Sequence, residues 1–241
     1  MPGKILAHLD CASPYSYFAL VQLKRIRPIL ATYNITIDLI PVFLGGINHA
    51  TGNVPPSTLP ARGRYGPYDM RRGVEHFGTV KVTTPPFFPM VSLLPQRCMV
   101  VLKQRYSAEV FETVFERLWV WVWVKHVDLA KPENMKAVLL EGEELDEKDV
   151  DEVLRLAGTK ELKAGLNENT RKAIEEYGAF GCPWLWVVKT DEEGKEVLAE
   201  PVFGSDRFTY VYRLLGVQFE DLKLLRKDEA GGTGSVGSAK L

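Results

Sequence analysis

The chain has 241 residues, of which 46% are apolar and 25% are charged. These ordinary globular values exclude full-length disorder, a collagen-like repeat and a coiled coil. Thirty basic and 31 acidic side chains give a formal net charge of −1, which disfavours a basic nucleic-acid-binding protein. The longest strongly apolar run, residues 118–124, is too short for a membrane span of about 20 residues.

The first part of the chain is expected to form a strand, a helix and a second strand. Residues 4–10 are apolar and end at a polar residue, which indicates a short strand. Ser13 and Pro14 then begin a helix, because serine is favoured as an N-cap and proline at the first helical position. Residues 35–43 are rich in β-branched side chains and predict a second strand, so the three elements indicate a βαβ unit.

The middle of the chain changes from loop-like to helical. Residues 45–67 are rich in glycine and proline and predict a long loop, which in a compact protein is usually functional or disordered. From residue 95 to about residue 177 the apolar spacing is typical of helices. The run from Trp119 to Trp123 also alternates as a strand would, but it continues a helical pattern without a turn, so we expect helix there.

The last third is expected to return to strands. Strands are predicted at residues 184–189 and 195–203 around a turn at 191–194, and a helix at 206–215. From residue 228 the chain is rich in glycine and serine and is expected to be flexible. The whole pattern predicts an α/β fold, a thioredoxin-like domain with an all-helical insertion. We assign residues 1–64 and 176–226 to the thioredoxin-like domain, 65–175 to the insertion and 227–241 to a flexible tail.

Three short segments carry residues suited to binding an anion or an extended ligand. Ser13 begins a helix whose N–H groups and dipole stabilise a thiolate or carboxylate, and from spacing alone an ordinary helix cap is the favoured explanation. Cys182 and Pro183 enter a strand, where a cis proline would expose backbone groups to a peptide-like ligand, or where the chain simply turns. Ser205 and Asp206 precede the last helix and either cap it or bind a carboxylate or an ammonium group.

Four motifs, DCASPYSYF, GNVPPSTLPARG, YGAFGCPWLWV and FGSDRF, occur in this order along the chain. Together they resemble the kappa-class glutathione transferases, and the resemblance extends from about residue 4 to residue 215. The 2-hydroxychromene-2-carboxylate isomerases and the DsbA-type oxidoreductases share this architecture. The resemblance therefore implies a DsbA-like thioredoxin fold with a helical insertion.

The resemblance also implies roles for individual residues. Ser13 matches the catalytic serine that hydrogen-bonds the glutathione sulfur. Asn53 and Arg62 match loop positions beside glutathione, the arginine suiting a carboxylate. Cys182, with Pro183 after it, matches the residue whose backbone pairs with the cysteinyl part of glutathione. The γ-glutamyl part is expected to bind at Ser205 and Asp206.

The function that this resemblance implies is transfer of glutathione to, or reduction of, small hydrophobic electrophiles, with glutathione as co-substrate and no metal. A glutathione-dependent isomerase of the 2-hydroxychromene-2-carboxylate type is one alternative, and a non-catalytic glutathione- or peptide-binding module is another. Dithiol exchange is not available, because serine stands at both Ser13 and Ser16, where DsbA-type enzymes need cysteine.

Five residues are weighed for further effects on the site. Cys11 and Cys182 are expected to be small buried residues, and the alternative is a mixed disulfide between one of them and glutathione. Trp184 and Trp186 are bulky enough to close an acceptor pocket, which would favour the binding module. His49 is expected to be a loop residue, with lining of the acceptor site as the alternative.

The chain ends in Ala239-Lys240-Leu241, which is similar to the Ser-Lys-Leu address read by the peroxisomal import receptor. Kappa-class enzymes often end in such a tripeptide. We therefore expect the peroxisome, with the mitochondrion or cytosol as alternatives. The family is usually dimeric, so a homodimer is expected.

Overall fold

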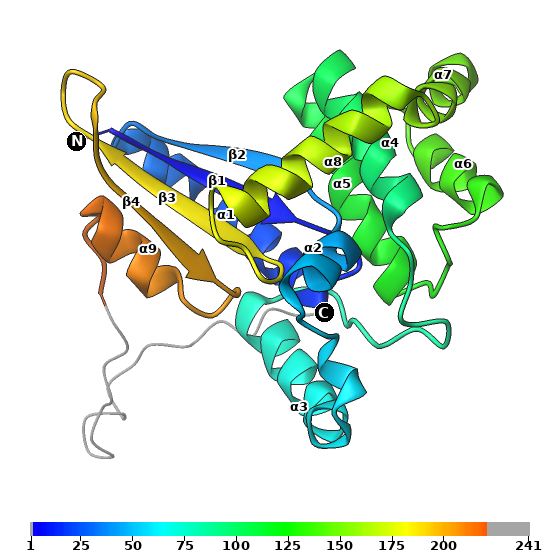
Figure 1. Ribbon diagram of the computed structural model, residues 1–241, viewed down its shortest axis with the longest axis horizontal. Coiled ribbons are helices and arrows are strands. Elements are labelled where there is room, and N and C mark those ends of the chain that lie inside the picture. Colours follow the sequence, from blue (N-terminus) through cyan, green and yellow to red (C-terminus); the bar gives the residue numbers. More distant parts are fainter. Residues whose placement is uncertain (1, 221–241) are drawn as a thin grey trace, which may run out of the picture.

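A computed structural model describes residues 2–220 of the chain. Its centre is a four-stranded sheet in the order β2-β1-β3-β4, formed by β1 (Gly3–Leu9), β2 (Ile35–Pro41), β3 (Trp184–Thr190) and β4 (Glu196–Phe203). The strands β1 and β2 are parallel, and β3 is antiparallel to both β1 and β4 (Figure 1). The predicted βαβ unit and the C-terminal pair of strands are therefore confirmed.

The two faces of β1 have different environments, because successive strand residues point to opposite sides of a sheet. Ile5, Ala7 and Leu9 are completely buried in the main core. Helix α1 (Pro14–Thr32) returns the chain from β1 to β2 and contributes to this core. The short helix α9 (Phe208–Leu215) follows β4 and contacts β3 and β4.

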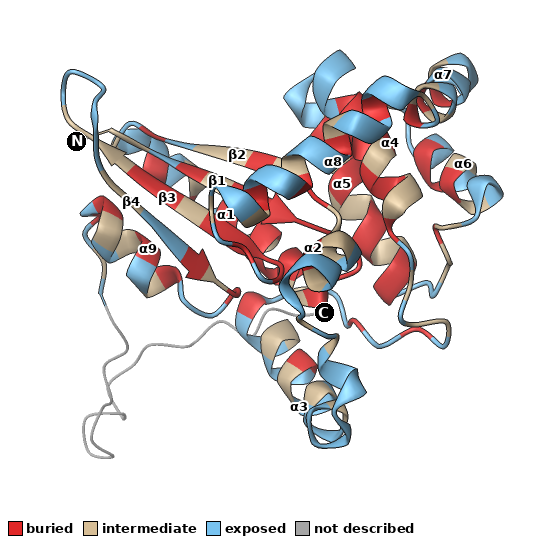
Figure 2. Cartoon of the chain, in the orientation of Figure 1, coloured by how far each residue is buried: buried red, intermediate tan, exposed pale blue. Residues whose placement is uncertain are grey.

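Helices fill the segment between β2 and β3, as the predicted helical insertion requires (Figure 1). Buried residues concentrate in α4 and α5 and in the sheet, whereas α3 is mostly exposed or intermediate (Figure 2). The helices of this segment are α2 (Leu44–Thr51), α3 (Pro60–Phe77), α4 (Leu93–Arg105), α5 (Ala108–Trp123), α6 (Pro132–Leu140), α7 (Glu147–Ala157) and α8 (Lys160–Glu175), together with the 3₁₀ turn η1 (Pro56–Thr58).

Helix α5 ties the insertion to the thioredoxin-like part. The run from Trp119 to Trp123 is helical, as predicted, and both of these tryptophans are buried. Their indole N–H groups donate to the backbone oxygens of Ser13 at 2.8 Å and Cys11 at 2.9 Å. The loop between β1 and α1 is therefore held by hydrogen bonds from the insertion.

The long loop predicted for residues 45–67 is wrong, because α2, η1 and the first half of α3 occupy it. Gly45 lies against the ring of Phe43, and a side chain there would come within 2.5 Å of that ring, so the residue serves close packing and not a turn. Pro56 and Pro60 stand at helix starts, where a missing N–H costs nothing. The glycines and prolines of this segment therefore belong to helices, although their abundance predicted a loop.

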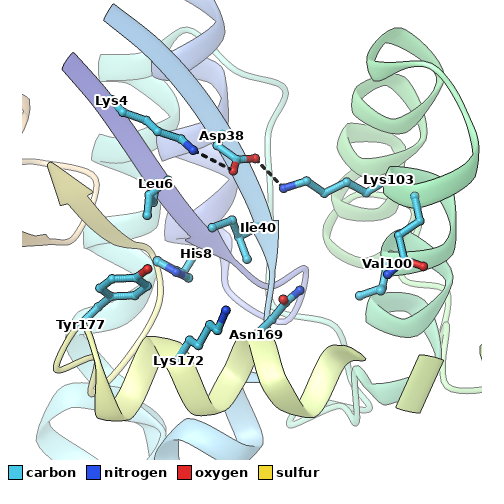
Figure 3. A pocket seen from close by; sticks show the side chains of 11 residues that line it. Lys4, Leu6, His8, Asp38, Ile40, Val100, Lys103, Asn169, Lys172 and Tyr177 are labelled. Carbon is cyan, nitrogen blue, oxygen red and sulfur yellow. Dashed lines mark hydrogen bonds and ion pairs between the residues drawn. The ribbon is translucent and has the colours of Figure 1, made fainter. Parts of the chain in front are cut away.

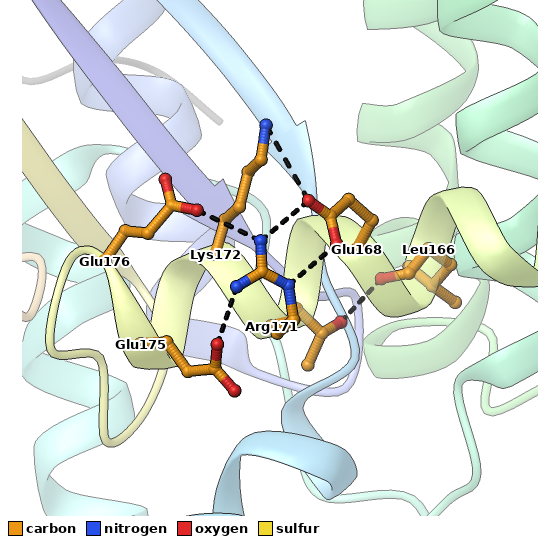
Figure 4. A network of polar contacts seen from close by, with 7 residues as sticks. Leu166, Glu168, Arg171, Lys172, Glu175 and Glu176 are labelled. Atoms are coloured by element: carbon orange, nitrogen blue, oxygen red, sulfur yellow. Dashed lines mark hydrogen bonds and ion pairs between the residues drawn. The ribbon is translucent and has the colours of Figure 1, made fainter.

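The charged face of α8 is exposed, as expected from its lysine and glutamate content. Figure 4 shows Arg171 bridging Glu168, Glu175 and Glu176 on this face. Exposed ion pairs of this kind each contribute at most about 1 kcal/mol to stability. On the opposite side, the Thr170 hydroxyl accepts a hydrogen bond from the Phe43 backbone N–H at 3.0 Å, which fixes α8 against the start of α2.

Residues 221–241, which include the whole predicted tail and the C-terminal tripeptide, lie outside the described residues. Within residues 2–220, no helix combines the length and apolar character that a membrane crossing requires. The division into domains at residues 64 and 175 stays a prediction, although α3 begins at Pro60 and so crosses the first of these boundaries.

Candidate active site

Ser13 is the N-cap of α1, with extended backbone angles (φ −111°, ψ 118°) and only 4% exposure. Its Oγ accepts a hydrogen bond from the Ser16 backbone N–H at 3.2 Å, which satisfies one of the unpaired donors of the first turn. The same hydroxyl donates to the backbone oxygen of Cys182 at 3.1 Å. The Ser13 side chain therefore caps the helix and also contacts the loop that holds the cis proline.

Asp10, three residues before Ser13, organises this loop from inside the protein. Its carboxylate is completely buried and accepts hydrogen bonds from the backbone N–H groups of Ala12 at 2.8 Å and Leu44 at 2.7 Å, and from the Ser92 hydroxyl at 2.7 Å. Burial raises the pKa of Asp10 from 3.8 to about 6, although these three hydrogen bonds oppose the rise. One carboxylate thus joins β1, α2 and the start of α4.

The peptide bond between Cys182 and Pro183 is cis, the first of the two alternatives that the sequence left open. The Pro183 carbonyl oxygen accepts from the Gly204 N–H at 3.1 Å, which brings the predicted γ-glutamyl segment beside the proline loop. The Cys182 side chain is 7% exposed, and burial, together with the charge of Asp10, raises the pKa of its thiol well above the ordinary value. Burial raises the pKa of the Cys11 thiol in the same way. Buried, protonated thiols are poor nucleophiles, which agrees with the expectation that both are structural.

Asn53 and Arg62 come from the segment between α2 and α3. The Asn53 amide donates to the backbone oxygen of Phe180 at 2.7 Å, and its own oxygen accepts from the Val54 N–H at 2.9 Å. Arg62 lies in the first turn of α3 and is exposed. Asn53 therefore fastens this segment to the residues before the cis proline, whereas the Arg62 guanidinium faces solvent at the cleft.

Ser205 and Asp206 do not cap the last helix, which corrects one of their two predicted roles. Helix α9 begins later, with Arg207 as N-cap and no side-chain cap. Gly204 has φ +91°, and a side chain there would come within 2.7 Å of Asp206 Oδ1, so glycine is required at this turn. Ser205 is buried, whereas the Asp206 carboxylate is 73% exposed and lies 3.5 Å from Arg207.

All seven site residues predicted from the sequence line one cleft of about 950 Å³. The cleft therefore collects four segments that are far apart in the chain: the start of α1, the α2–α3 connection, the cis-proline loop and the turn before α9. His49, Trp184 and Trp186 are not among its lining residues. Trp184 packs against Phe180 and Phe203, and neither tryptophan fills the cleft, so the structure gives no support to closure of the acceptor pocket by these residues.

One wall of the cleft was missed in the sequence. It is formed by α1 and α3, where the rings of Phe18 and Phe77 stack with centroids 5.3 Å apart and the Tyr15 hydroxyl donates to Asp69 at 2.8 Å. The missed residues recur at the three- and four-residue spacing of a helix face, a signal that the neighbouring glycines and prolines obscured. On α3 they are Asp69, Arg72, Gly73, His76 and Phe77.

Among residues 2–220, no group of three or more histidine, cysteine or acidic side chains is placed to hold a metal ion. The polar groups of the cleft are instead those that suit an organic ligand: hydroxyls, an amide, guanidinium groups and exposed backbone.

Comparison with known proteins decides the family. The model of the DSBA-like thioredoxin domain matches residues 4–215. Glutathione S-transferase kappa 2 of Caenorhabditis elegans is 31% identical over 216 residues, covering 88% of this chain and 91% of the relative. The chain belongs to the kappa-class glutathione S-transferases. Human glutathione S-transferase kappa 1 is 29% identical over 221 residues, covering 90% of this chain and 92% of the human protein.

Solved structures support the DsbA-like thioredoxin fold of this kappa-class chain. A 2-hydroxychromene-2-carboxylate isomerase aligns with a TM-score of 0.67 at 20% identity, covering 88% of this chain and 94% of the isomerase. A probable DsbA oxidoreductase from Streptomyces coelicolor aligns with a TM-score of 0.65 at 13% identity, covering 93% of this chain and 94% of the oxidoreductase. At these identities the likeness shows the fold alone.

Proposed function

We propose that the protein is a glutathione transferase, in which Ser13 stabilises the thiolate of glutathione for attack on a small hydrophobic electrophile. The observation that carries this proposal is the position of the Ser13 hydroxyl. It lies at the N-terminus of a 19-residue helix, in one cleft with the cis-Pro183 loop and Asp206. The family to which the chain belongs supports the same activity.

The cleft offers partners for charged groups of glutathione. The tripeptide carries two carboxylates, one ammonium group and a thiol. In this proposal Arg62 binds a carboxylate and Asp206 binds the ammonium group, which is supported by the exposed charges that both residues bring to the cleft. The turn at Ser205 supplies further hydrogen-bonding groups. The cysteinyl part then lies along the Cys182 backbone, beside Ser13.

Binding the thiolate requires Ser13 to change its hydrogen bond. A serine hydroxyl has one proton, and in the structure that proton is donated to the Cys182 carbonyl oxygen. A thiolate is a charged acceptor and competes well for this donor. Rotation of the hydroxyl toward sulfur releases the Cys182 oxygen, which becomes available to the cysteinyl N–H of glutathione. A single rotation therefore serves both contacts.

The wall between α1 and α3 suits the electrophile. Phe18 and Phe77 form an apolar surface there, and Gly73 allows the two helices to approach, because a side chain at this position would come within 2.4 Å of the Phe18 ring. In the transfer, the sulfur lone pair forms a bond to the electrophilic carbon and the leaving group departs with its electron pair. The thiol proton has already passed to water. With 1-chloro-2,4-dinitrobenzene the leaving group is chloride.

The test combines three measurements on the full chain. Calorimetry detects glutathione binding, ultraviolet absorbance of the complex against pH gives the thiol pKa, and turnover of 1-chloro-2,4-dinitrobenzene reports transfer. All three are expected to be positive. If the thiolate formed without transfer and the protein turned over 2-hydroxychromene-2-carboxylate, the function would be that of the isomerase and not that of the transferase. Binding without a lowered thiol pKa would leave a non-catalytic module.

Two finer proposals rest on the family resemblance and the C-terminal residues. The first is a homodimer, which sedimentation of the purified chain tests directly. The second is import into the peroxisome through Ala239-Lys240-Leu241, which the import receptor would read. One residue appended after Leu241 should leave the protein in the cytosol, and import that survives this extension would contradict the proposal.

A further inference from the structure

A second cavity, of about 430 Å³, lies on the sheet face opposite the one that packs on the main core. Lys4, Leu6 and His8 of β1 point into it, whereas the alternate residues of this strand are in the core. Figure 3 shows the cavity between the sheet, α4 and α8. No residue lines both this cavity and the cleft, so the two sites are separate.

The lining of the cavity is cationic. It includes Lys4, Lys103 and Lys172 but a single carboxylate, Asp38. Asp38 is shared by Lys4 at 3.6 Å and Lys103 at 2.5 Å. Among the side chains that line the cavity, three cations therefore face one anion.

Lys172 is the cation with the weakest partner. Figure 3 shows its side chain extending from α8 into the cavity, between His8 and Asn169. Its ion pair, with Glu168, is long at 3.9 Å. Glu168 already accepts two hydrogen bonds of 2.8 Å from Arg171 (Figure 4). The Lys172 ammonium group is therefore available to an anion in the cavity.

His8 supplies a neutral, oriented polar group. It is 1% exposed, and burial lowers its pKa from 6.5 to about 4, so the ring is neutral at pH 7. Its Nδ1 lies 3.2 Å from the Trp184 carbonyl oxygen, which can only accept, so Nδ1 carries the proton. Its Nε2 has no hydrogen-bond partner within residues 2–220.

The apolar part of the lining comes from Leu6, Ile40 and Val100, and the polar side chains of Gln104, Asn169 and Tyr177 complete the cavity. We propose that this cavity is a second ligand site, which binds a small organic carboxylate with an apolar body. Lys172 pairs with the carboxylate, and the three aliphatic side chains contact the body of the ligand. The apolar floor distinguishes this ligand from inorganic phosphate, which has charge but no apolar surface.

The experiment observes His8 directly. The chain has four histidines, and the other three are exposed, so they can be replaced by His49→Gln, His76→Gln and His126→Asn. Asparagine suits position 126 because its φ is +55°. The Cε1–Hε1 signal of His8 is then followed by NMR during titration with benzoate, with benzamide as the neutral isostere and inorganic phosphate as the charged ligand without an apolar body. Each titration is repeated with the cleft saturated by S-hexylglutathione.

Benzoate is expected to shift the His8 signal saturably, with or without S-hexylglutathione, and to bind more tightly than benzamide or phosphate. Lys172→Gln should weaken the affinity for benzoate about fivefold. Lys163→Gln makes the same charge change on the same helix but outside the cavity, so it should leave benzoate binding unchanged. Asp38→Asn should tighten binding by a similar factor, because it removes the carboxylate. Absence of a saturable shift, equal binding of benzamide or phosphate, loss of the shift with S-hexylglutathione, or an unaffected Lys172→Gln variant would overturn the proposal.

Discussion

The Ser13 hydroxyl donates a hydrogen bond of 3.1 Å to the backbone oxygen of Cys182, a residue 169 positions away in the chain. The contact joins the N-terminus of α1 to the cis-proline loop, two segments that belong to the two halves of the thioredoxin-like domain. A thiolate placed between them would meet a hydroxyl donor, the positive end of a helix dipole and an extended backbone.

Ser13→Ala should separate glutathione binding from thiol activation. The hydrogen bond to a charged sulfur contributes about 1.5–3 kcal/mol, so its loss should raise the pKa of the bound thiol by about one to two. Conjugation near pH 7 should slow about tenfold or more, for the same reason. Most of the affinity should remain, because Arg62 and Asp206 are unchanged. The ultraviolet titration of the complex measures this pKa, and superimposable curves for wild type and variant would mean that Ser13 is only a helix cap.

Ser16→Ala is the matched control for this substitution. Ser16 is completely buried in the same helical turn, and its Oγ has no hydrogen-bond partner within the described chain. Removing a buried unpaired hydroxyl should leave the free energy of unfolding unchanged or raise it by about 1 kcal/mol. Glutathione turnover should be unchanged. A loss of activity equal to that of Ser13→Ala would show that the whole helix start, and not the Ser13 hydroxyl, controls the reaction.

The positions of Ser13, Pro183 and Asp206 in the cleft could be predicted from the sequence, because each lies within two residues of the start of a helix or strand. Strand and helix starts follow from local apolar spacing and capping residues, and four motifs in a fixed order placed them in one known architecture. The cis conformation of Pro183 followed from the same architecture.

The wall formed by α3 could not be predicted, because its local composition opposes its structure. Gly63, Gly66 and Pro67 lie within α3, and such residues disfavour helices when considered alone. The helix is nevertheless held by tertiary contacts, including the stack of Phe18 on Phe77. Local propensity is a weak guide wherever packing of this kind compensates for it.

The role of Asp206 is tested most sharply by removing the ammonium group from the ligand. Glutaryl-cysteinyl-glycine is glutathione without its amino group, so it cannot pair with a carboxylate. Because Asp206 is 73% exposed, Asp206→Asn should weaken glutathione binding only about two- to fivefold. The same substitution should leave binding of the deaminated peptide unchanged, as measured by calorimetry. If the substitution weakened binding of both peptides equally, Asp206 would act by maintaining the conformation of the turn and not by pairing with the ammonium group.

Cys182 should be dispensable as a side chain, because the proposed contact with glutathione uses its backbone. Burial raises the pKa of its thiol, so the native protein should react slowly with a thiol reagent such as 5,5′-dithiobis(2-nitrobenzoate). Cys182→Ala should retain glutathione affinity and turnover, at a modest cost in stability. Rapid modification of Cys182 in native protein, or loss of turnover in the alanine variant, would favour the mixed-disulfide alternative.

Asp10 should make the stability of this protein depend on pH in the opposite direction to an ordinary salt-bridged aspartate. Burial raises its pKa from 3.8 to about 6, so the folded protein holds this proton up to about pH 6. The unfolded chain releases it near pH 3.8. Between these two values the folded state binds more protons, and the free energy of unfolding therefore falls as the pH rises.

The difference in unfolding free energy between wild type and Asp10→Asn should report this effect, because the contributions of the other titrating groups are the same in both proteins and cancel. Leu44 and Ser92 both donate to Asp10 Oδ2, and an asparagine amide nitrogen at that position cannot accept either hydrogen bond, so the variant should be less stable at pH 4. From pH 4 to pH 7 the wild type should lose roughly 2 kcal/mol relative to the variant, which is most of the free energy that corresponds to its raised pKa. Urea unfolding at several pH values measures the change, with the exposed Asp206→Asn as control. A difference that stays constant with pH would show that Asp10 is already ionised in the folded protein at pH 4.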